Sequence, residues 1–372
     1  MNYPAIVVIA YNRDEALNRL LNSLAKAIYP EGVQIPLIIS IDKGDNEDVI
    51  CTAEKFEWKN GIKKVIKREE NYGLKKHVIT CGNLVNEYEN IIVLEDDIYV
   101  SPAFYGYAYD ALSFTSEEER IAGISLYDHR LNVHVREPFQ AYNDGYDNYY
   151  FQIASSWGQA FSRDKWNGFV SWMKENDGKD LKADNMPENI SSWSDKSWLK
   201  YFIKYMIETD KYFFYPNGSF TTNFGDEGTN EKVPVNDFQV PMITSKHRNY
   251  CFSTLEESNA VYDAFFENTK LNVLFEDTEI DLYGYKPLMK KRYLLSSKSY
   301  PYRVVESFGR RLRPLDANIF DNVKGDDFYL YDTEKEDTSP ERRDARRVLY
   351  NYRALSAKKM IKVFLFRLFG KQ

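Results

Sequence analysis

The chain has 372 residues, 43% hydrophobic and 28% charged, values typical of a folded globular protein that exclude global disorder. The length fits one large domain or two smaller ones. A net charge of −7 excludes a general nucleic-acid-binding protein. Three widely spaced cysteines exclude a disulfide framework or a zinc knuckle and favour a reducing compartment.

The first apolar run, residues 5–10, follows Met-Asn-Tyr-Pro without a basic segment before it or a cleavage site after it. No run approaches the ~18 apolar residues that a membrane-spanning helix needs. We therefore expect a soluble, cytoplasmic protein without a leader.

The first hundred residues alternate buried-strand patterns with helical ones. Strands are predicted at residues 5–10, 35–41, 64–67 and 91–94, and helices at 13–27, 49–56 and 74–85. This alternation indicates an α/β fold with a mainly parallel sheet covered by helices on both faces. Ligands bind such sheets at the carboxyl ends of the strands, where polar residues follow three of the predicted strands.

The remainder is less regular. A helix is predicted at residues 104–114 and a strand at 121–126, followed by a loop-rich part, 142–230, that supplies a binding surface. Further helices are predicted at 256–266 and 283–295. Residues 331–344 have the composition of a linker.

Three acidic residues, Glu95, Asp96 and Asp97, directly follow the predicted buried strand at 91–94. Adjacent carboxylates repel one another unless a cation or a hydrogen-bonding ligand lies between them. Mg²⁺ and Mn²⁺ commonly bind one or two carboxylates together with substrate phosphates. The motif indicates such a metal site, and the alternative is a solvated acidic strand exit.

Residues 92–104 resemble the metal-binding segment of GT-A glycosyltransferases, particularly the N-acetylglucosaminyltransferase I type and bacterial family-two-like enzymes of surface-polysaccharide synthesis. The resemblance extends over roughly residues 4–250, through segments in the family's order: 6–13, 39–44, 71–75, 156–158, 193–198 and 223–230. It implies a Rossmann-like nucleotide-diphospho-sugar transferase fold.

The resemblance also implies a domain organisation. Residues 1–250 would form the GT-A domain, with 1–100 as its nucleotide-binding half and 101–250 as its acceptor and lid half. Beyond the resemblance, the residue patterns predict a helical extension at 251–330, then the linker 331–344 and a basic amphipathic tail at 345–372.

Site roles follow from the same resemblance. Asp97 would ligate the metal, Asp96 would hold the nucleotide or a metal-bound water, and Glu95 would face the donor sugar. Arg13 would meet the diphosphate or uracil, and Asp42 would bind uracil or ribose. The alternatives are a surface charge at a helix start for Arg13 and an ordinary turn residue for Asp42.

Three more residues belong to the predicted nucleotide site. Asn12 precedes Arg13 at the end of the first strand, and Lys75 lies with Lys76 near a predicted helix N-terminus, which favours phosphate binding. The alternative for both lysines is a solvated helix face.

Asp195, between Trp193 and Trp198, takes the position of the family's catalytic base, which removes a proton from the acceptor hydroxyl. The alternative is a helix N-cap before the apolar run that starts at Trp198. The family often has two adjacent acids here, whereas this chain has Ser194 before Asp195.

Residues 224–230 contain two glycines and resemble the family's mobile lid, which excludes water; the alternative is a surface loop. Trp157 and Trp193 suit stacking on sugar rings or packing in a core. The four histidines, His77, His129, His134 and His247, show no metal-ligand spacing, and His247 is an outside candidate because related enzymes place a histidine ligand after the lid.

Together these features predict an inverting glycosyltransferase that uses a nucleotide sugar, most simply a UDP-sugar, with Mn²⁺ or Mg²⁺. The acceptor implied by the resemblance is a bacterial capsule or O-antigen precursor at the inner face of the cell membrane. Two alternatives are a non-catalytic sugar-nucleotide-binding protein and a nucleotidyltransferase, although no glycine-rich phosphate loop follows the first strand.

Residues 345–372 carry eight basic and no acidic residues, which leaves −15 on residues 1–344. Apolar residues lie among these charges, at Val348, Leu349, Tyr352, Leu355, Ile361, Phe364, Leu365, Leu368 and Phe369. A basic amphipathic helix of this kind is typical of contact with an anionic membrane. The alternative is packing on the acidic part of the same protein or of a second copy.

Overall fold

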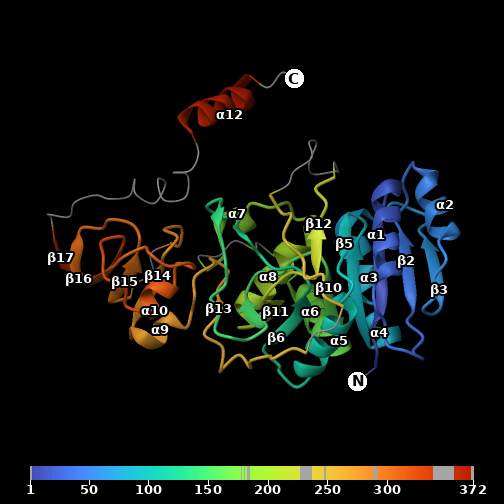
Figure 1. Cartoon of the computed structure of the whole chain (residues 1–372), viewed down its shortest axis with the longest axis horizontal. Coiled ribbons are helices and arrows are strands. Elements are labelled where there is room, and N and C mark those ends of the chain that lie inside the picture. Colours follow the sequence, from blue (N-terminus) through green and yellow to red (C-terminus); the bar gives the residue numbers. More distant parts are fainter. Residues whose placement is uncertain are drawn as a thin grey trace. The chain divides into compact units, whose positions relative to one another are not determined.

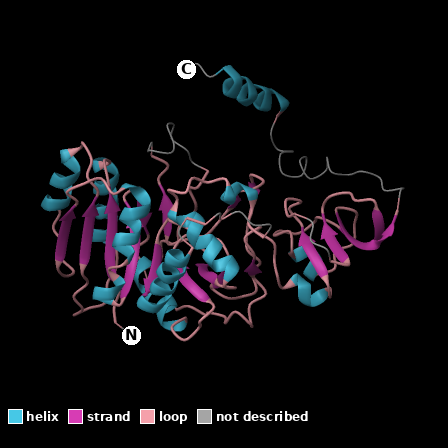
Figure 2. Cartoon of the chain, turned by 180° about the vertical axis from the view of Figure 1, so that it is seen from behind, coloured by secondary structure: helices cyan, strands magenta, loops and turns pink. Residues whose placement is uncertain are grey.

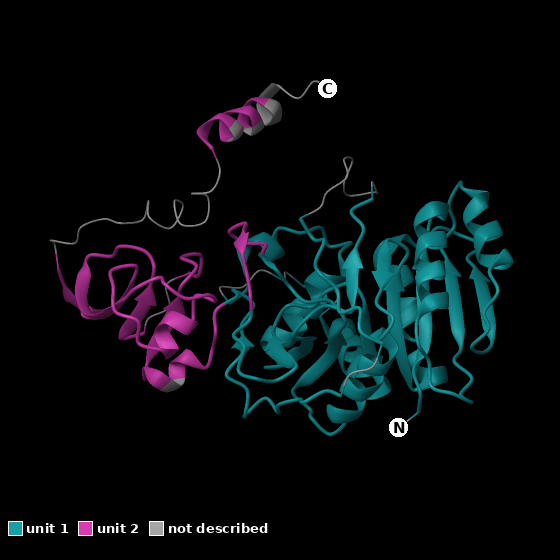
Figure 3. Ribbon diagram, in the orientation of Figure 1, with its two compact units in different colours: residues 1–131, 141–266 teal, residues 132–140, 267–372 magenta. Residues whose placement is uncertain are grey.

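The structure is a computed structural model that describes residues 2–176, 178–179, 181, 185–226, 237–246, 249–287, 291–337 and 356–369. The chain forms two compact units (Figures 1 and 3). Unit 1 comprises residues 1–131 and 141–266, and unit 2 comprises residues 132–140 and 267–372.

Unit 1 is built on a nine-stranded sheet with the order β13-β9-β11-β6-β10-β4-β1-β2-β3. In chain order these strands are β1 (Ala5–Ala10), β2 (Leu37–Ile41), β3 (Lys63–Lys67), β4 (Asn90–Glu95), β6 (Ile121–Ser125), β9 (Asn148–Phe151), β10 (Gln159–Ser162), β11 (Tyr212–Pro216) and β13 (Val261–Tyr262). Five of the eight neighbouring pairs among these described strands are parallel, which confirms the predicted α/β fold with a mainly parallel sheet.

Helices pack against the sheet (Figure 2). They are α1 (Asp14–Lys26), α2 (Glu47–Lys55), α3 (Gly73–Gly82), α4 (Val85–Tyr88), α5 (Phe104–Phe114), α6 (Arg163–Glu175), α7 (Glu188–Ser191) and α8 (Trp198–Glu208). Apolar side chains of α1, α2 and α5 form one core with β1, β2 and β4. On the other face, α3 packs against β1 and β4, and its His77 contacts Ser40 of β2. Gly82 of α3 leaves room for the buried ring of Trp166 of α6.

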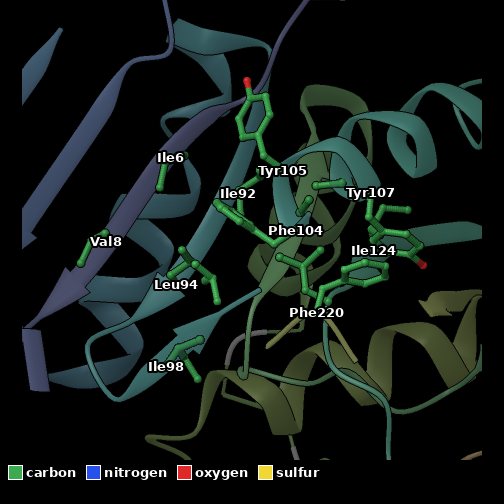
Figure 4. Packing of buried hydrophobic residues seen from close by; sticks show 14 of the residues in the cluster. Ile6, Val8, Ile92, Leu94, Ile98, Phe104, Tyr105, Tyr107, Ile124 and Phe220 are labelled. Carbon is green, nitrogen blue, oxygen red and sulfur yellow. The ribbon is translucent and has the colours of Figure 1, made fainter. Parts of the chain in front are cut away.

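The core explains why β1 and β4 are continuous apolar runs. Both strands are buried on both faces, so neither needs the alternation of a half-exposed strand. Figure 4 shows Ile6 and Val8 of β1 and Ile92 and Leu94 of β4 on the same side of the sheet as Phe104 of α5. The strand ends that carry the candidate site therefore belong to a tightly packed part of the chain.

A short antiparallel pair extends the polar end of β4. It joins β5 (Ile98–Val100) to β12 (Thr221–Asn223), with Asn223 opposite Ile98. Another short pair is β7 (Leu131–Asn132) with β8 (Glu137–Pro138).

Unit 2 has its own four-stranded sheet, in the order β14-β15-β17-β16. The strands are β14 (Thr278–Asp281), β15 (Tyr293–Ser296), β16 (Tyr302–Phe308) and β17 (Phe328–Glu336), with the short helices α9 (Leu271–Leu274) and α10 (Ala317–Phe320). A separate apolar cluster that includes Leu271, Ile280, Leu295 and Phe308 forms its core.

The predicted helical extension at residues 251–330 is wrong. Residues 256–266 contain a turn at which the Asp144 carboxylate accepts hydrogen bonds from Ser258 and Asn259, and then strand β13. Unit 1 therefore continues to Phe266 and does not end at residue 250.

The predicted helix at 283–295 is also wrong, because its described part contains β15. Gly284 adopts a φ of 64°, and a proline at position 287 has no N–H to donate within a helix. The predicted linker 331–344 begins inside β17, and its residues 338–344 lie outside the described residues.

The predicted loop-rich part, residues 142–230, contributes more regular structure than expected. It supplies three strands of the large sheet, β9, β10 and β11, together with α6 and α8. Their buried aromatic side chains, such as Phe161, Phe202 and Phe213, pack in tilted and edge-to-face contacts and obscure the usual apolar–polar alternation.

Helix α12 (Ala357–Phe369) forms the described part of the predicted basic tail. Its apolar side chains Met360, Ile361, Phe364 and Leu365 are between 45% and 62% exposed. Among the described helices, none combines the length and the apolar character needed to cross a bilayer.

Candidate functional site

The register of three parallel strands brings the predicted site residues together. Ala10 of β1 lies opposite Ile41 of β2, and Ile9 of β1 lies opposite Glu95 of β4. The residues that directly follow these pairs therefore leave the sheet at one edge, as expected for parallel strands. They are Asn12 and Arg13 after β1, Asp42 after β2, and Asp96 and Asp97 after β4.

Arg13 links the ends of β1 and β4. Its guanidinium forms an ion pair with Asp96, and its Nη1 donates a 3.0 Å hydrogen bond to Oδ2 of Asp97. The backbone N–H of Tyr11 donates to the other oxygen of Asp96 at 3.4 Å. The structure thus brings Arg13, Asp96 and Asp97 into one charged cluster.

Burial makes this cluster electrostatically costly. Asp96 is 3% exposed, and burial raises its pKa to about 6 although Arg13 acts in the opposite direction. Burial, followed by the charges of Asp97 and Asp96, raises the pKa of Glu95 to about 8. A single arginine therefore leaves negative charge in a partly desolvated place, which favours a bound cation.

Asp97 has one side-chain oxygen without a partner among the described residues. Its side chain is 14% exposed, and its buried Oδ1 has no hydrogen-bond partner in the structure. Searched over the described residues, no group of three or more His, Cys, Asp or Glu side chains is arranged to hold a metal ion. The residues present fit a Mg²⁺ or Mn²⁺ ion held by Asp97 and completed by substrate phosphate oxygens, because such ions often use only one or two protein carboxylates.

Asp42 has a defined structural role. Its Oδ1 accepts hydrogen bonds from the backbone N–H groups of Lys43 (3.0 Å) and Tyr72 (2.8 Å), and its Oδ2 accepts one from Gly73 (2.9 Å). A buried carboxylate at this point caps the N-terminus of α3 and complements its dipole. The base or ribose contact predicted for Asp42 stays a prediction.

Asn12 joins the loops that follow β1 and β2. Its Oδ1 accepts from the backbone N–H of Asp45 at 3.2 Å and lies so close to Gly44 that a Cβ there would approach it to 1.8 Å. The Asn46 side chain in turn donates to the Asn12 carbonyl at 3.0 Å. The structure thus shows Asn12 shaping the site, and its predicted nucleotide contact stays a prediction.

Lys75 connects α3 to the segment that carries Asp195. Its Nζ lies 3.4 Å from the backbone oxygen of Asp195 and 3.5 Å from the centre of the Tyr201 ring. Lys76 instead pairs with Glu70 and is exposed, in agreement with the solvated face weighed as its alternative. Of the two lysines, Lys75 is therefore the one directed toward the predicted base.

Asp195 is not a helix N-cap, because α8 begins at Trp198 with Ser197 at the N-cap position. Its side chain is 81% exposed and accepts a 2.8 Å hydrogen bond from Lys200. That hydrogen bond and the charge of Lys200 hold the pKa of Asp195 below its usual range. Asp195 is therefore ionised at neutral pH and open to an acceptor hydroxyl.

The start of the predicted lid lies beside the acidic cluster. The N–H of Phe224 donates to the carbonyl of Asp97 at 3.0 Å, and Arg19 of α1 both covers the Phe224 ring and pairs with Asp226. Residues 227–230 of this segment lie outside the described residues.

The predictions for the tryptophans and histidines are tested only in part. The half-buried Trp157 packs between Tyr127 and Phe238, with ring centroids 4.7 and 4.6 Å away, which agrees with its packing alternative. His77 is buried against Ser40, with its pKa lowered by burial to about 4. Trp193 is half-buried, and His247 lies outside the described residues.

Sequence reasoning missed two partners of the site residues. Ser156 lies close enough to Glu95 for its hydroxyl to oppose the rise in the pKa of that carboxyl. Lys200 both binds Asp195 and donates to the carbonyl of Trp193 at 2.9 Å. The sequence does contain a signal for the Lys200 contact: Lys200 lies five residues after Asp195, in the helix that begins at Trp198. Ser156 offered none beyond its place in the resembling segment 156–158.

No model of a known protein family matches the chain, and no curated protein matches it in sequence. Among solved structures, S. aureus TarS residues 1–349 in complex with UDP-GlcNAc is similar at 17% identity, covering 60% of this chain and 59% of that one with a TM-score of 0.39. GalNAc-T7 with UDP, GalNAc and Mn²⁺ is similar at 13% identity, covering 58% of this chain and 43% of that one with a TM-score of 0.38.

A third similar structure is the mannosyltransferase PcManGT from Pyrobaculum calidifontis in complex with GDP-Man and Mn²⁺, at 12% identity. The match covers 48% of each chain with a TM-score of 0.32. The chain thus spans less than two thirds of each of these structures.

The cap of α3 gives a prediction for the protein without any ligand. Asp42→Asn replaces one accepting oxygen by an NH₂ group, so one of the backbone N–H groups loses its charged acceptor. The free energy of unfolding in urea should fall by about 1.5–3 kcal/mol. The exposed Asp45 lies in the same loop, and Asp45→Asn should change the free energy of unfolding by less than about 0.5 kcal/mol. Equal stability of the two variants would contradict the capping role.

Proposed function

We propose that the chain is a metal-dependent glycosyltransferase of the GT-A type that takes a nucleotide sugar, most simply a UDP-sugar, as donor. The observation that carries this proposal is the buried, unpartnered Oδ1 of Asp97 beside Asp96 and Arg13 at the end of β4. A site of this kind suits a ligand that brings both a cation and phosphate oxygens.

The charges around the site fit a diphosphate leaving group. A divalent ion held by Asp97 would neutralise the charge that develops on the diphosphate when the glycosidic bond breaks. Arg13 supplies a second positive charge at the same strand ends, and Glu95, the last residue of β4, would face the donor sugar. No residue has to protonate the leaving group.

Asp195 is the proposed general base. In an inverting transfer, the acceptor hydroxyl oxygen bonds to the anomeric carbon while the bond from that carbon to the diphosphate oxygen breaks, and Asp195 takes the hydroxyl proton. The hydrogen bond from Lys200 holds the carboxylate ionised and fixes its orientation. The exposed position of Asp195 leaves room for a large glycan acceptor.

We further propose that the acceptor is a lipid-linked bacterial glycan met at the inner surface of the membrane. The support is the tail: eight basic residues without an acidic one, and four exposed apolar side chains on α12. Each Lys or Arg near an anionic surface contributes about 1 kcal/mol to binding. Lys358 and Lys362 lie on α12 beside the exposed Ile361 and Phe364.

The metal-dependent donor site is tested with UDP and Mn²⁺. In Mn²⁺, UDP at about 100 times its dissociation constant should stabilise the protein by roughly 2.7 kcal/mol, seen as a rise in melting temperature. Asp97→Asn should abolish the metal-dependent part of this rise and raise the barrier to transfer by at least ~3 kcal/mol. Equal stabilisation by UDP in Mn²⁺ and in excess chelator would contradict the proposal.

The base is tested separately. Asp195→Asn retains the size of the side chain but cannot accept a proton, so turnover should fall by a factor of ~10² or more while donor binding is unchanged. The neighbouring Ser194→Ala serves as the control and should retain turnover. A variant Asp195→Asn with undiminished turnover would remove Asp195 from the mechanism, and donor binding without any transfer in the native protein would favour the non-catalytic alternative.

The membrane contact is tested by sedimentation with liposomes. The full chain should bind vesicles with anionic lipids at low salt and bind less at high salt, whereas a chain without residues 345–372 should not bind and should still bind UDP. Phe364→Gln retains every charge and should weaken binding by removing exposed apolar surface. If the full and the shortened chain bind vesicles equally, the tail is not the membrane contact. If neither chain binds, the result favours packing of the tail on the acidic part of the same protein or of a second copy.

A further inference from the structure

Arg13 already contacts Asp97, the carboxylate proposed to hold the metal ion. One arm of its guanidinium is bound to Asp97, the proposed metal ligand, and the other to Asp96. A guanidinium and a divalent cation are both attracted to these carboxylates and repel one another. The two cations would therefore compete for Asp97.

The local structure allows the arginine side chain to move without disturbing the fold. The backbone of Arg13 is fixed, since its carbonyl accepts the N–H of Leu17 in the first turn of α1 (3.0 Å). The side chain makes no capping hydrogen bond to α1 and is 29% exposed. Only side-chain torsions have to change for the guanidinium to leave Asp97.

The two carboxylates differ in what else binds them. Asp96 accepts a hydrogen bond from the backbone N–H of Tyr11 in addition to its ion pair with Arg13. For Asp97, Oδ2 accepts from Arg13 and the buried Oδ1 has no partner. Asp97 is therefore the carboxylate that the arginine can release to a metal ion while Asp96 remains held.

We propose that Arg13 is an internal counter-ion of the metal site, which a divalent cation displaces from Asp97 and which then binds the diphosphate of the donor. This inference rests on the proposed function. Arg13 weakens the binding of the metal ion alone and strengthens the binding of the metal ion together with the nucleotide. The exchange couples metal and donor binding, so that the metal ion and the nucleotide bind cooperatively.

The effect of removing Arg13 should therefore have opposite signs in two measurements. Without nucleotide, Arg13→Gln should bind Mn²⁺ at least ~10-fold more tightly than the native chain, measured by calorimetry or by the electron paramagnetic resonance signal of free Mn²⁺. In saturating Mn²⁺, the same variant should bind UDP at least ~10-fold more weakly. Arg13→Lys keeps the charge but not the two-armed contact, so its Mn²⁺ affinity should lie between the two.

Arg19→Gln is the matched control, because Arg19 lies in α1, the helix that Arg13 precedes, and pairs with Asp226 instead of the cluster. Its Mn²⁺ affinity without nucleotide should stay within about twofold of the native value. If Arg13→Gln proves poorly folded by circular dichroism, the comparison of Arg13→Lys with Arg19→Gln decides the matter.

The outcomes separate this inference from the proposed function. If the native chain binds Mn²⁺ and Arg13→Gln binds it with equal or lower affinity, the counter-ion role is overturned and the proposed function stands. An equal gain in affinity for Arg19→Gln would also overturn it, because the effect would then be one of overall charge. No Mn²⁺ binding to any variant, with or without UDP, would overturn both.

Discussion

The geometry of the candidate site depends on the register of three parallel strands, β1, β2 and β4. Because β1 pairs with β2 and β4 so that Ala10 meets Ile41 and Ile9 meets Glu95, the chain leaves all three strands at one edge. This register brings Arg13 against Asp96 and Asp97, residues that are more than eighty positions away in the sequence. A slip of one residue in β4 would turn each side chain to the opposite face of the sheet.

The same arrangement has an energetic cost, because it places several carboxylates at one buried strand end. The strands are buried on both faces, so the acidic residues at the end of β4 are partly desolvated, and burial raises the pKa values of Glu95 and Asp96. Arg13 offsets part of this cost. A packed core thus holds a charged cluster with an unpartnered ligand atom, which is how proteins prepare sites for charged substrates.

Much of this site is predictable from the sequence, for a physical reason. Strands that are apolar throughout, such as β1 and β4, produce a strong local signal, and the rule for parallel sheets then places the residues after them at one edge. The cluster of Arg13, Asp96 and Asp97 follows from this rule. The capping of α3 by Asp42 does not, because it depends on backbone N–H groups thirty residues away.

The failed predictions have a common cause as well. At residues 256–266 and 283–295 the apolar residues, aromatic and aliphatic, occur close together in short runs, so their spacing fits a helix as well as a strand. Tertiary contacts decided between the two, through the Asp144 turn before β13 and through the pairing of β15 with β17. The ion pair of Lys200 with Asp195 likewise required the observed start of α8.

A crystal structure with Mn²⁺ and UDP, using the anomalous scattering of manganese, tests the central claim most directly. The account predicts one anomalous peak within coordination distance of Asp97, bound also by both phosphates of UDP. A peak elsewhere in the chain, or UDP bound with its diphosphate away from Asp97, would contradict it.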